Sequence, residues 1–154
     1  MNRHSRDQWL LVRAGAQLCA LPLEQVNETM RPQPVRPVSG APHFVRGVAV
    51  LRGLPVPVID AASMIGQTES TSRGSRFVAL KTADRRVALA VDEVIGVRRI
   101  DEGALSDLPR LLAAASEQVV SAIGTLDAEL LMVLESGKLV PETVWAAIEA
   151  ERHR

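Results

Sequence analysis

The sequence is short of the residues on which most catalytic and metal sites depend. Its 154 residues include one cysteine, three histidines, two tryptophans, two phenylalanines and no tyrosine. A single cysteine, Cys19, excludes an intramolecular disulfide and a cysteine-rich metal site, and its place in an apolar run predicts a buried side chain. No histidine has another histidine at metal-ligating spacing, so we expect neither a metal nor a cofactor.

Neither sign of charge is in excess, and no long apolar run is present. The 18 basic and 18 acidic residues cancel, which leaves no overall field to attract nucleic acid or an anionic membrane. No stretch approaches the roughly 20 apolar residues of a membrane span, and the charged residues 1–7 do not resemble a signal peptide. The composition therefore predicts a soluble, cytoplasmic protein that does not insert into membranes.

Familiar catalytic motifs are missing as well. The sequence has no phosphate-binding loop and no nucleophile elbow. Its acids occur as adjacent pairs such as Asp92–Glu93, whose side chains would point to opposite faces of a strand. We therefore expect no enzymatic activity.

What the sequence does contain is strands. Its apolar runs are short, rich in Val, Ile and Leu, and bounded by Gly, Pro, Asp or Ser. They predict four hairpins, with turns at residues 14–16, 52–53, 83–84 and 127–128. Pro141 and Glu142 favour the start of a C-terminal helix over 141–152, and Asp60 is a candidate N-cap for a short turn over 61–65. The expected fold is mainly β.

The two halves of the sequence resemble each other. A shift of 68 residues, from 9 to 77, places Trp9–Val12 on Phe77–Leu80, and a shift of 75, from 48 to 123, places Val48–Leu51 on Ile123–Leu126. This indicates a duplicated unit of roughly 65 residues. We expect one domain, 1–154, made of two similar β-subdomains over about 8–66 and 76–140 that share hydrophobic surface. Trp9 and Phe77 are expected in the core.

The stretch from Arg31 to Asp60 is unusual in holding six of the nine prolines. Its strand Leu54–Ile59 contains Pro55 and Pro57, which cannot donate to a ladder, so the strand lies at an edge or leaves one side unpaired. Such an apolar edge is either a docking surface or an edge blunted against pairing, and the residues alone leave both open.

Charge in the same region raises two further questions. No acid occurs from Thr29 to Ile59, while four arginines do, so nucleic-acid binding is an alternative, although few aromatics are available for base stacking. Glu28 and Arg52 stand at the ends of this stretch and can pair if their strands are neighbours. The alternative is an ordinary surface pair of no functional consequence.

The order of these segments resembles the CheW family of bacterial chemotaxis coupling proteins. The resemblance runs from about Gln8 to Glu149 and is carried by Leu21–Glu28, Pro42–Val48, Leu51–Asp60 and Arg86–Val94. It implies two intertwined, five-stranded SH3-like barrels with a short C-terminal helix. It also implies a non-catalytic adaptor that works in a cytoplasmic signalling array.

The resemblance further implies partners and sites. The partners are the regulatory domain of a CheA-type histidine kinase and the cytoplasmic tip of a methyl-accepting chemoreceptor, and self-association within the array is compatible with it. The implied receptor-binding residues are Val26, Glu28, Gly47, Arg52 and Val97. The implied kinase-binding residues are Arg46, Gly53 and Pro55.

One position departs from the family pattern. Val50 stands where the family usually has asparagine, and its side chain can neither donate nor accept a hydrogen bond. A divergent member that binds only one of the two partners, or that serves another motility output, is therefore an alternative to the full coupling role. A nucleic-acid-binding β-barrel is the less favoured alternative.

Overall fold

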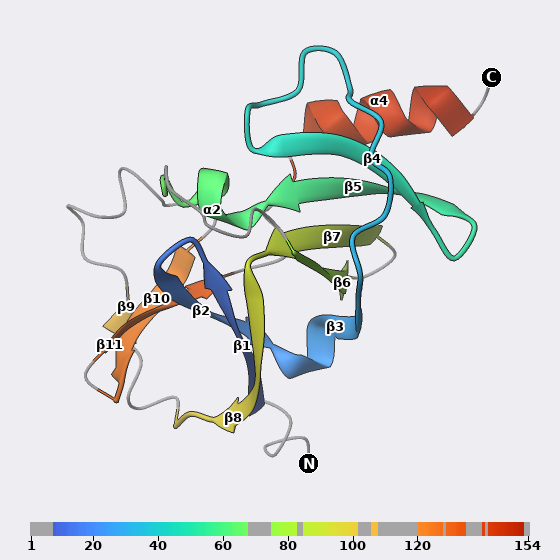
Figure 1. Cartoon of the computed structure of the whole chain (residues 1–154). Coiled ribbons are helices and arrows are strands. Elements are labelled where there is room, and N and C mark those ends of the chain that lie inside the picture. The colour runs from blue at the N-terminus through green and yellow to red at the C-terminus, as the bar shows by residue number, and fades with distance from the viewer. Residues whose placement is uncertain are drawn as a thin grey trace.

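A computed structural model describes residues 8–67, 75–82, 85–101, 106–107, 120–127, 129–134, 140 and 142–152. Its strands form two sheets, with a helix, α4, beside the upper one in the view of Figure 1. Sheet A has the strand order β8-β1-β2-β11-β10-β9, and sheet B has the order β3-β6-β7-β5-β4. The mainly β prediction is therefore correct.

Sheet A combines strands from the start of the described chain, residues 8–22, with strands from its second half, between residues 93 and 134. Its strands are β1 (Gln8–Ala14), β2 (Gln17–Pro22), β8 (Glu93–Arg99), β9 (Ser106–Asp107), β10 (Val120–Leu126) and β11 (Glu129–Leu134). Neighbours are antiparallel except β2 and β11, which run parallel over three residue pairs. The sheet has six strands rather than the expected five because the two-residue β9 extends it.

Sheet B has the expected five strands. They are β3 (Val26–Met30), which follows a 3-10 turn, η1 (Leu23–Gln25), and then β4 (Val45–Leu51), β5 (Leu54–Asp60), β6 (Arg76–Thr82) and β7 (Arg85–Val91). Here too one pair is parallel, β5 with β7, over residues 58–60 and 88–90. All four predicted hairpins are present, as β1–β2, β4–β5, β6–β7 and β10–β11, although residues 83, 84 and 128 of their turns lie outside the described residues.

The internal similarity of the sequence appears as equivalent pairing in the two sheets. Phe77 faces Met30 in sheet B, and the corresponding residues Trp9 and Arg98 face each other in sheet A. The parallel pairs correspond in the same way, Val58 with Ala88 and Val133 with Ala20. The first hairpin of the first half, β1–β2, belongs to sheet A with β8 to β11 of the second half. The first hairpin of the second half, β6–β7, belongs to sheet B with β3 to β5 of the first half. Similarity runs along the sequence, whereas each sheet is built from both halves.

A shared core joins the sheets, as the duplication predicted. One buried cluster combines residues of sheet A, such as Val12 and Leu21, with residues of sheet B, such as Leu80 and Leu89. Trp9 and Phe77 are both buried as expected, each in a smaller cluster that belongs to its own sheet. Cys19 is buried in the shared core, and desolvation raises the pKa of its thiol to about 12.

Two helices complete the fold. Helix α2 (Ala61–Met64) begins where predicted, because the Asp60 side chain accepts a hydrogen bond from the Ser63 backbone N–H at 3.3 Å. Helix α4 (Glu142–Arg152) buries Val144 and Ile148 in the shared core. Arg85 holds this helix from β7, through an ion pair with Glu142 at 2.6 Å and a guanidinium that lies 4.8 Å from the Trp145 ring centroid.

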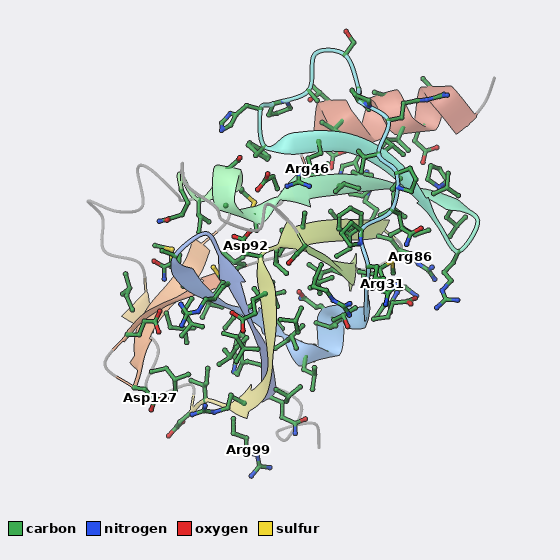
Figure 2. All side chains as sticks on the ribbon, viewed as in Figure 1. Arg31, Arg46, Arg86, Asp92, Arg99 and Asp127 are labelled. Atoms are coloured by element: carbon green, nitrogen blue, oxygen red, sulfur yellow. The ribbon has the colours of Figure 1, made fainter. Side chains whose placement is uncertain are left out.

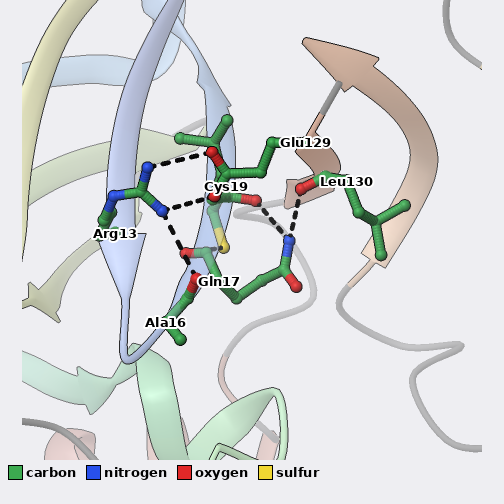
Figure 3. Close-up of polar contacts among 7 residues, drawn as sticks. Arg13, Ala16, Gln17, Cys19, Glu129 and Leu130 are labelled. Atoms are coloured by element: carbon green, nitrogen blue, oxygen red, sulfur yellow. Dashed lines mark hydrogen bonds and ion pairs between the residues drawn. The ribbon is translucent and has the colours of Figure 1, made fainter. Parts of the chain in front are cut away.

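A polar clip fastens the first hairpin to the last (Figure 3). Arg13, in β1, donates to both carboxylate oxygens of Glu129, in β11, at 2.6 and 3.1 Å. Gln17, at the start of β2, donates from Nε2 to the Leu130 backbone oxygen at 2.8 Å. These bonds add to the three parallel residue pairs that hold β2 against β11.

The proline-containing strand lies inside sheet B rather than at an edge. β5 pairs with β4 along its length but reaches β7 only from Val58 onward, so the second of the two expected arrangements is present. Val48 uses both its N–H and its C=O on Arg36, at 2.8 Å each, so its pairing with Pro57 contains no ladder hydrogen bond. The nitrogens of Pro55 and Pro57 therefore point away from β4. On that side β5 has no paired strand before Val58 among the described residues, so the missing N–H groups break no ladder hydrogen bond.

Candidate functional site

The predicted pair of Glu28 and Arg52 is formed. Arg52 lies in the turn between β4 and β5 with a positive φ of 52°. Its Nε donates to Glu28 Oε2 at 3.1 Å and its Nη2 to Oε1 at 2.7 Å, a bidentate geometry that fits the guanidinium fork. The hydrogen bonds from Arg52 lower the pKa of Glu28 below its ordinary value of 4.5. The Arg52 side chain is nevertheless 72% exposed and available to a partner.

This ion pair does not join neighbouring strands. β3, which carries Glu28, and β4, which leads to Arg52, are the two outer strands of sheet B. The pair is formed, although its strands are not the neighbours that the sequence analysis supposed: the two residues meet because the five-stranded sheet curves until its edges approach. A small hollow of about 240 Å³ between these edges is lined by both residues, with Val50 at its rim. The pair closes the barrel on one exposed side.

Gly47 lies in β4, beneath the segment that precedes it. A Cβ on this residue would lie 2.0 Å from the Arg36 carbonyl oxygen, and its φ is +142°. Only glycine allows the segment 31–44 to lie this close to β4. The structure thus gives Gly47 a role inside the fold.

The other two expected receptor residues differ in how near they lie to the pair, since Val26 shares β3 with Glu28 and Val97 belongs to the other sheet. Val26 begins β3 and packs partly buried against the shared core. Val97 belongs to sheet A, on its outer strand β8, where it is 49% exposed. Exposed Ile95 lies two residues away on the same strand, and the sequence analysis did not single it out. The structure brings together Glu28 and Arg52 and leaves Val97 on a different sheet.

Of the expected kinase-binding residues, Arg46 is partly used within the fold. Its Nη2 and Nε lie 2.8 and 3.2 Å from Asp60 Oδ2, and Asp60 is also the residue that caps α2. Figure 2 shows Arg46 beside β5, near α2. Gly53, with φ +79°, and Pro55 lie at the other end of the hairpin, beside exposed Val50 and Leu54. This hairpin end is the more accessible part of the expected kinase surface.

Comparison with known proteins decides the family. The sequence model of the CheW-like domain matches residues 8–144. The chain belongs to the CheW family. It is 29% identical over 126 residues to the chemotaxis protein CheW of Thermotoga maritima, covering 82% of each chain. It is 31% identical over 104 residues to protein PilI of Pseudomonas aeruginosa, covering 66% of this chain and 58% of that one.

A solved CheW structure has the same fold. The crystal structure of the scaffolding protein TtCheW from Thermoanaerobacter tengcongensis matches with a TM-score of 0.74 at 23% identity, over 84% of this chain and 89% of that one. The two SH3-like barrels with a short C-terminal helix, expected from the resemblance, are thereby confirmed. The CheW family is a family of scaffold and adaptor proteins.

Sequence reasoning missed one feature of this CheW-family site. A groove of about 800 Å³ is lined by the segment 34–39, by Val48, Val50 and Pro55 of the β4–β5 hairpin, and by Ala147 and Ile148 of α4. The sequence pattern did single out the proline-rich stretch 31–60, which supplies one wall of the groove. Nothing in the sequence indicated that α4, about a hundred positions later, supplies the other.

Neither a metal site nor a membrane-spanning helix is found in the part of the chain that the structure describes. Within the described ranges, no group of three or more His, Cys, Asp or Glu side chains is placed to hold a metal ion. No helix in that part of the chain is long and apolar enough to span a membrane.

Proposed function

We propose that this CheW-family chain is a non-catalytic, cytoplasmic adaptor that couples the signalling tips of chemoreceptors to a CheA-type histidine kinase in an array. The observation that carries the proposal is the exposed, bidentate pair of Glu28 and Arg52, two positions that the family resemblance assigns to receptor binding. The ion pair orients the Arg52 guanidinium at the closed edge of sheet B. Receptor binding then uses Arg52 and Glu28 with Val26 nearby on β3, and Val97 contributes from sheet A.

Kinase binding is proposed at the accessible hairpin end. Gly53 and Pro55 lie there beside exposed Val50 and Leu54, and small apolar clusters of this kind carry much of the energy of protein interfaces. Arg46 lies at the opposite end of the same hairpin, where its guanidinium ties β4 to Asp60 at the end of β5, and is proposed to act indirectly by holding the two strands together. In this arrangement the adaptor performs no chemistry and transmits signals through changes in packing between its partners.

The test is capture of two purified partners from the same organism, the kinase regulatory domain and a receptor signalling-tip fragment. Wild-type protein should capture both. Arg52→Ala should weaken receptor capture while the unfolding midpoint stays unchanged, because the pair is exposed. Arg31→Ala, which removes another exposed arginine that forms no ion pair among the described residues, is the matched control. Unchanged receptor capture by Arg52→Ala would count against this site.

A member that binds only one partner is the second candidate, favoured by Val50. This residue is 68% exposed beside Arg52 and replaces an asparagine that the family usually has. If wild-type protein captures one partner only, Val50→Asn should restore the other. Capture of neither partner would contradict the adaptor role, and binding of nucleic acid that weakens steeply with salt would then support the remaining alternative.

A further inference from the structure

The groove between the proline-rich segment and α4 is apolar and open. Its lining combines Val48, Val50 and Pro55 from the β4–β5 hairpin with the segment 34–39 on one side and α4 on the other. In Figure 1 the segment arches over β4 close to α4. Ala147 faces into the groove with a side chain too small to fill it, while Ile148 is buried in the shared core. The volume of about 800 Å³ is in the range that binding sites use.

The backbone along one side of this groove is an incomplete strand edge. β4 is an outer strand of sheet B, and Arg36 covers it at one point, where its N–H and C=O bond to those of Val48. The next outward-facing position on β4 is Val50. Pro34, the residue that would face it, has no N–H to donate, and no backbone bond joins residues 31–44 to Val50. The edge is therefore open to an added strand at Val50.

The charge beside this edge is positive and uncompensated. Of the four arginines between Thr29 and Ile59, Arg46 pairs with Asp60 and Arg52 pairs with Glu28. Arg36, on the groove, and Arg31 are exposed, and neither forms an ion pair with any residue that the structure describes. A carboxylate on a bound segment would give Arg36 the partner that this chain does not supply.

We propose that this groove binds an extended, apolar segment carrying a carboxylate, and that the kinase regulatory domain supplies it. The segment adds to β4 at Val50, places apolar side chains between Pro55 and Ala147, and pairs its carboxylate with Arg36. The assignment to the kinase rests on the proposed function, because Pro55 belongs both to the expected kinase surface and to the groove. Helix α4 thereby becomes part of the docking surface.

A pair of variants on α4 tests the role of the helix. Ala147→Glu places a carboxylate in the apolar groove, where it also repels the acidic segment, and should weaken kinase binding at least about tenfold. Ala146→Glu makes the same change at an exposed neighbouring position and should leave binding within about twofold of wild type. Binding is measured by titration with the purified kinase regulatory domain. Equal effects of the two variants would overturn the proposal.

A second pair tests the charge without touching α4. Arg36→Glu keeps the backbone bonds to Val48 and reverses the charge on the groove, so kinase binding should weaken about tenfold. Arg31→Glu reverses another exposed charge, on a residue that does not line the groove, and is the control. Receptor capture by both variants should match wild type. Loss of receptor capture or of self-association, with kinase binding unchanged, would overturn the assignment to the kinase.

The design separates the two proposals. If wild-type protein does not bind the kinase domain, the kinase part of the proposed function fails and this inference fails with it. If wild-type protein binds but Ala147→Glu and Arg36→Glu bind equally well, only the groove assignment is wrong and the hairpin end suffices.

Discussion

At the scale of single residues, Gly47 shows how a position assigned to a partner can act inside the fold. A Cβ there would meet the Arg36 carbonyl oxygen at 2.0 Å, and the φ of +142° adds strain for any other residue. Gly47→Ala should push the segment 31–44 off β4 and lower the free energy of unfolding by about 3 kcal/mol. Urea denaturation followed by circular dichroism measures this loss.

The matched control is Gly40→Ala. Gly40 also has a positive φ, +79°, but a Cβ there would meet nothing within 4 Å. Strain alone should lower the free energy of unfolding by about 1 kcal/mol. If both variants lost the same amount, the backbone conformation and not the close approach to Arg36 would explain the glycine at 47.

Residue pairs also show where sequence reasoning stopped. Glu28 and Arg52 could be named as a pair because they are the charged residues that bracket an acid-free stretch. The geometry of this pair could not be predicted from the sequence, because it depends on the curvature of the whole of sheet B. The pairing of Arg46 with Asp60 was not anticipated either. Arg46 falls at a register shift in the β4–β5 hairpin, between Val45 and Gly47, and such a bulge changes where a side chain points.

At the scale of elements, the clip between the first and last hairpins gives a pH-dependent prediction. Hydrogen bonds from Arg13 lower the pKa of Glu129 below its ordinary value of 4.5. A carboxyl whose pKa is lower in the folded state stabilises the fold above its unfolded pKa, and this contribution is lost as the pH falls through the folded value. Glu129→Gln should therefore be less stable than wild type at pH 7, and the difference should shrink as the pH falls below 4.5 and through the lowered folded pKa.

Thermal unfolding midpoints between pH 7 and pH 3 provide the measurement. Glu24→Gln is the control, because Glu24 is exposed and forms no ion pair within the described ranges. Its midpoint should follow that of wild type at every pH. A difference between Glu129→Gln and wild type that stayed the same size from pH 7 to pH 3 would show that the charge on Glu129 is not what holds β11 to the first hairpin.

Elements differed in how far the sequence predicted them. The four hairpins and α2 were found because the hairpin strands are buried and apolar, the turns contain Gly or Asp, and Asp60 marks the start of α2. The residue pattern did not delimit β3 or β8, although Glu28 was taken to lie on a strand. Both are outer strands, and few of their residues are buried, so neither shows a continuous apolar run. The C-terminal helix was predicted from its first turn and its apolar spacing, but not its contribution to the groove.

At the scale of the whole molecule, the exchange of hairpins between halves could not be read from the repeat. Equivalent strands of the two halves have similar apolar patterns. From these patterns, β1 and β2 could pair with strands of their own half or of the other half about equally well. Only the family resemblance implied that the barrels are intertwined. The structure shows the consequence: β6 and β7 lie between β3 and β5, and β2 lies between β1 and β11.

This arrangement predicts that neither half folds alone. A fragment 1–74 would contain β3 without its neighbour β6, and β5 without its neighbour β7, while β1 and β2 would lose β8 and β11. Fragments 1–74 and 75–154 should each lack a cooperative unfolding transition, and mixing them should restore both the transition and a complex of the mass of the full chain. The control is full-length protein with a protease site placed within 68–74 and cut after folding. It should keep its transition, since the cut leaves every described strand pair in place. Cooperative unfolding of the isolated 1–74 fragment would mean that the first five strands can form a barrel of their own, and that the exchange is an outcome of assembly rather than a condition for folding.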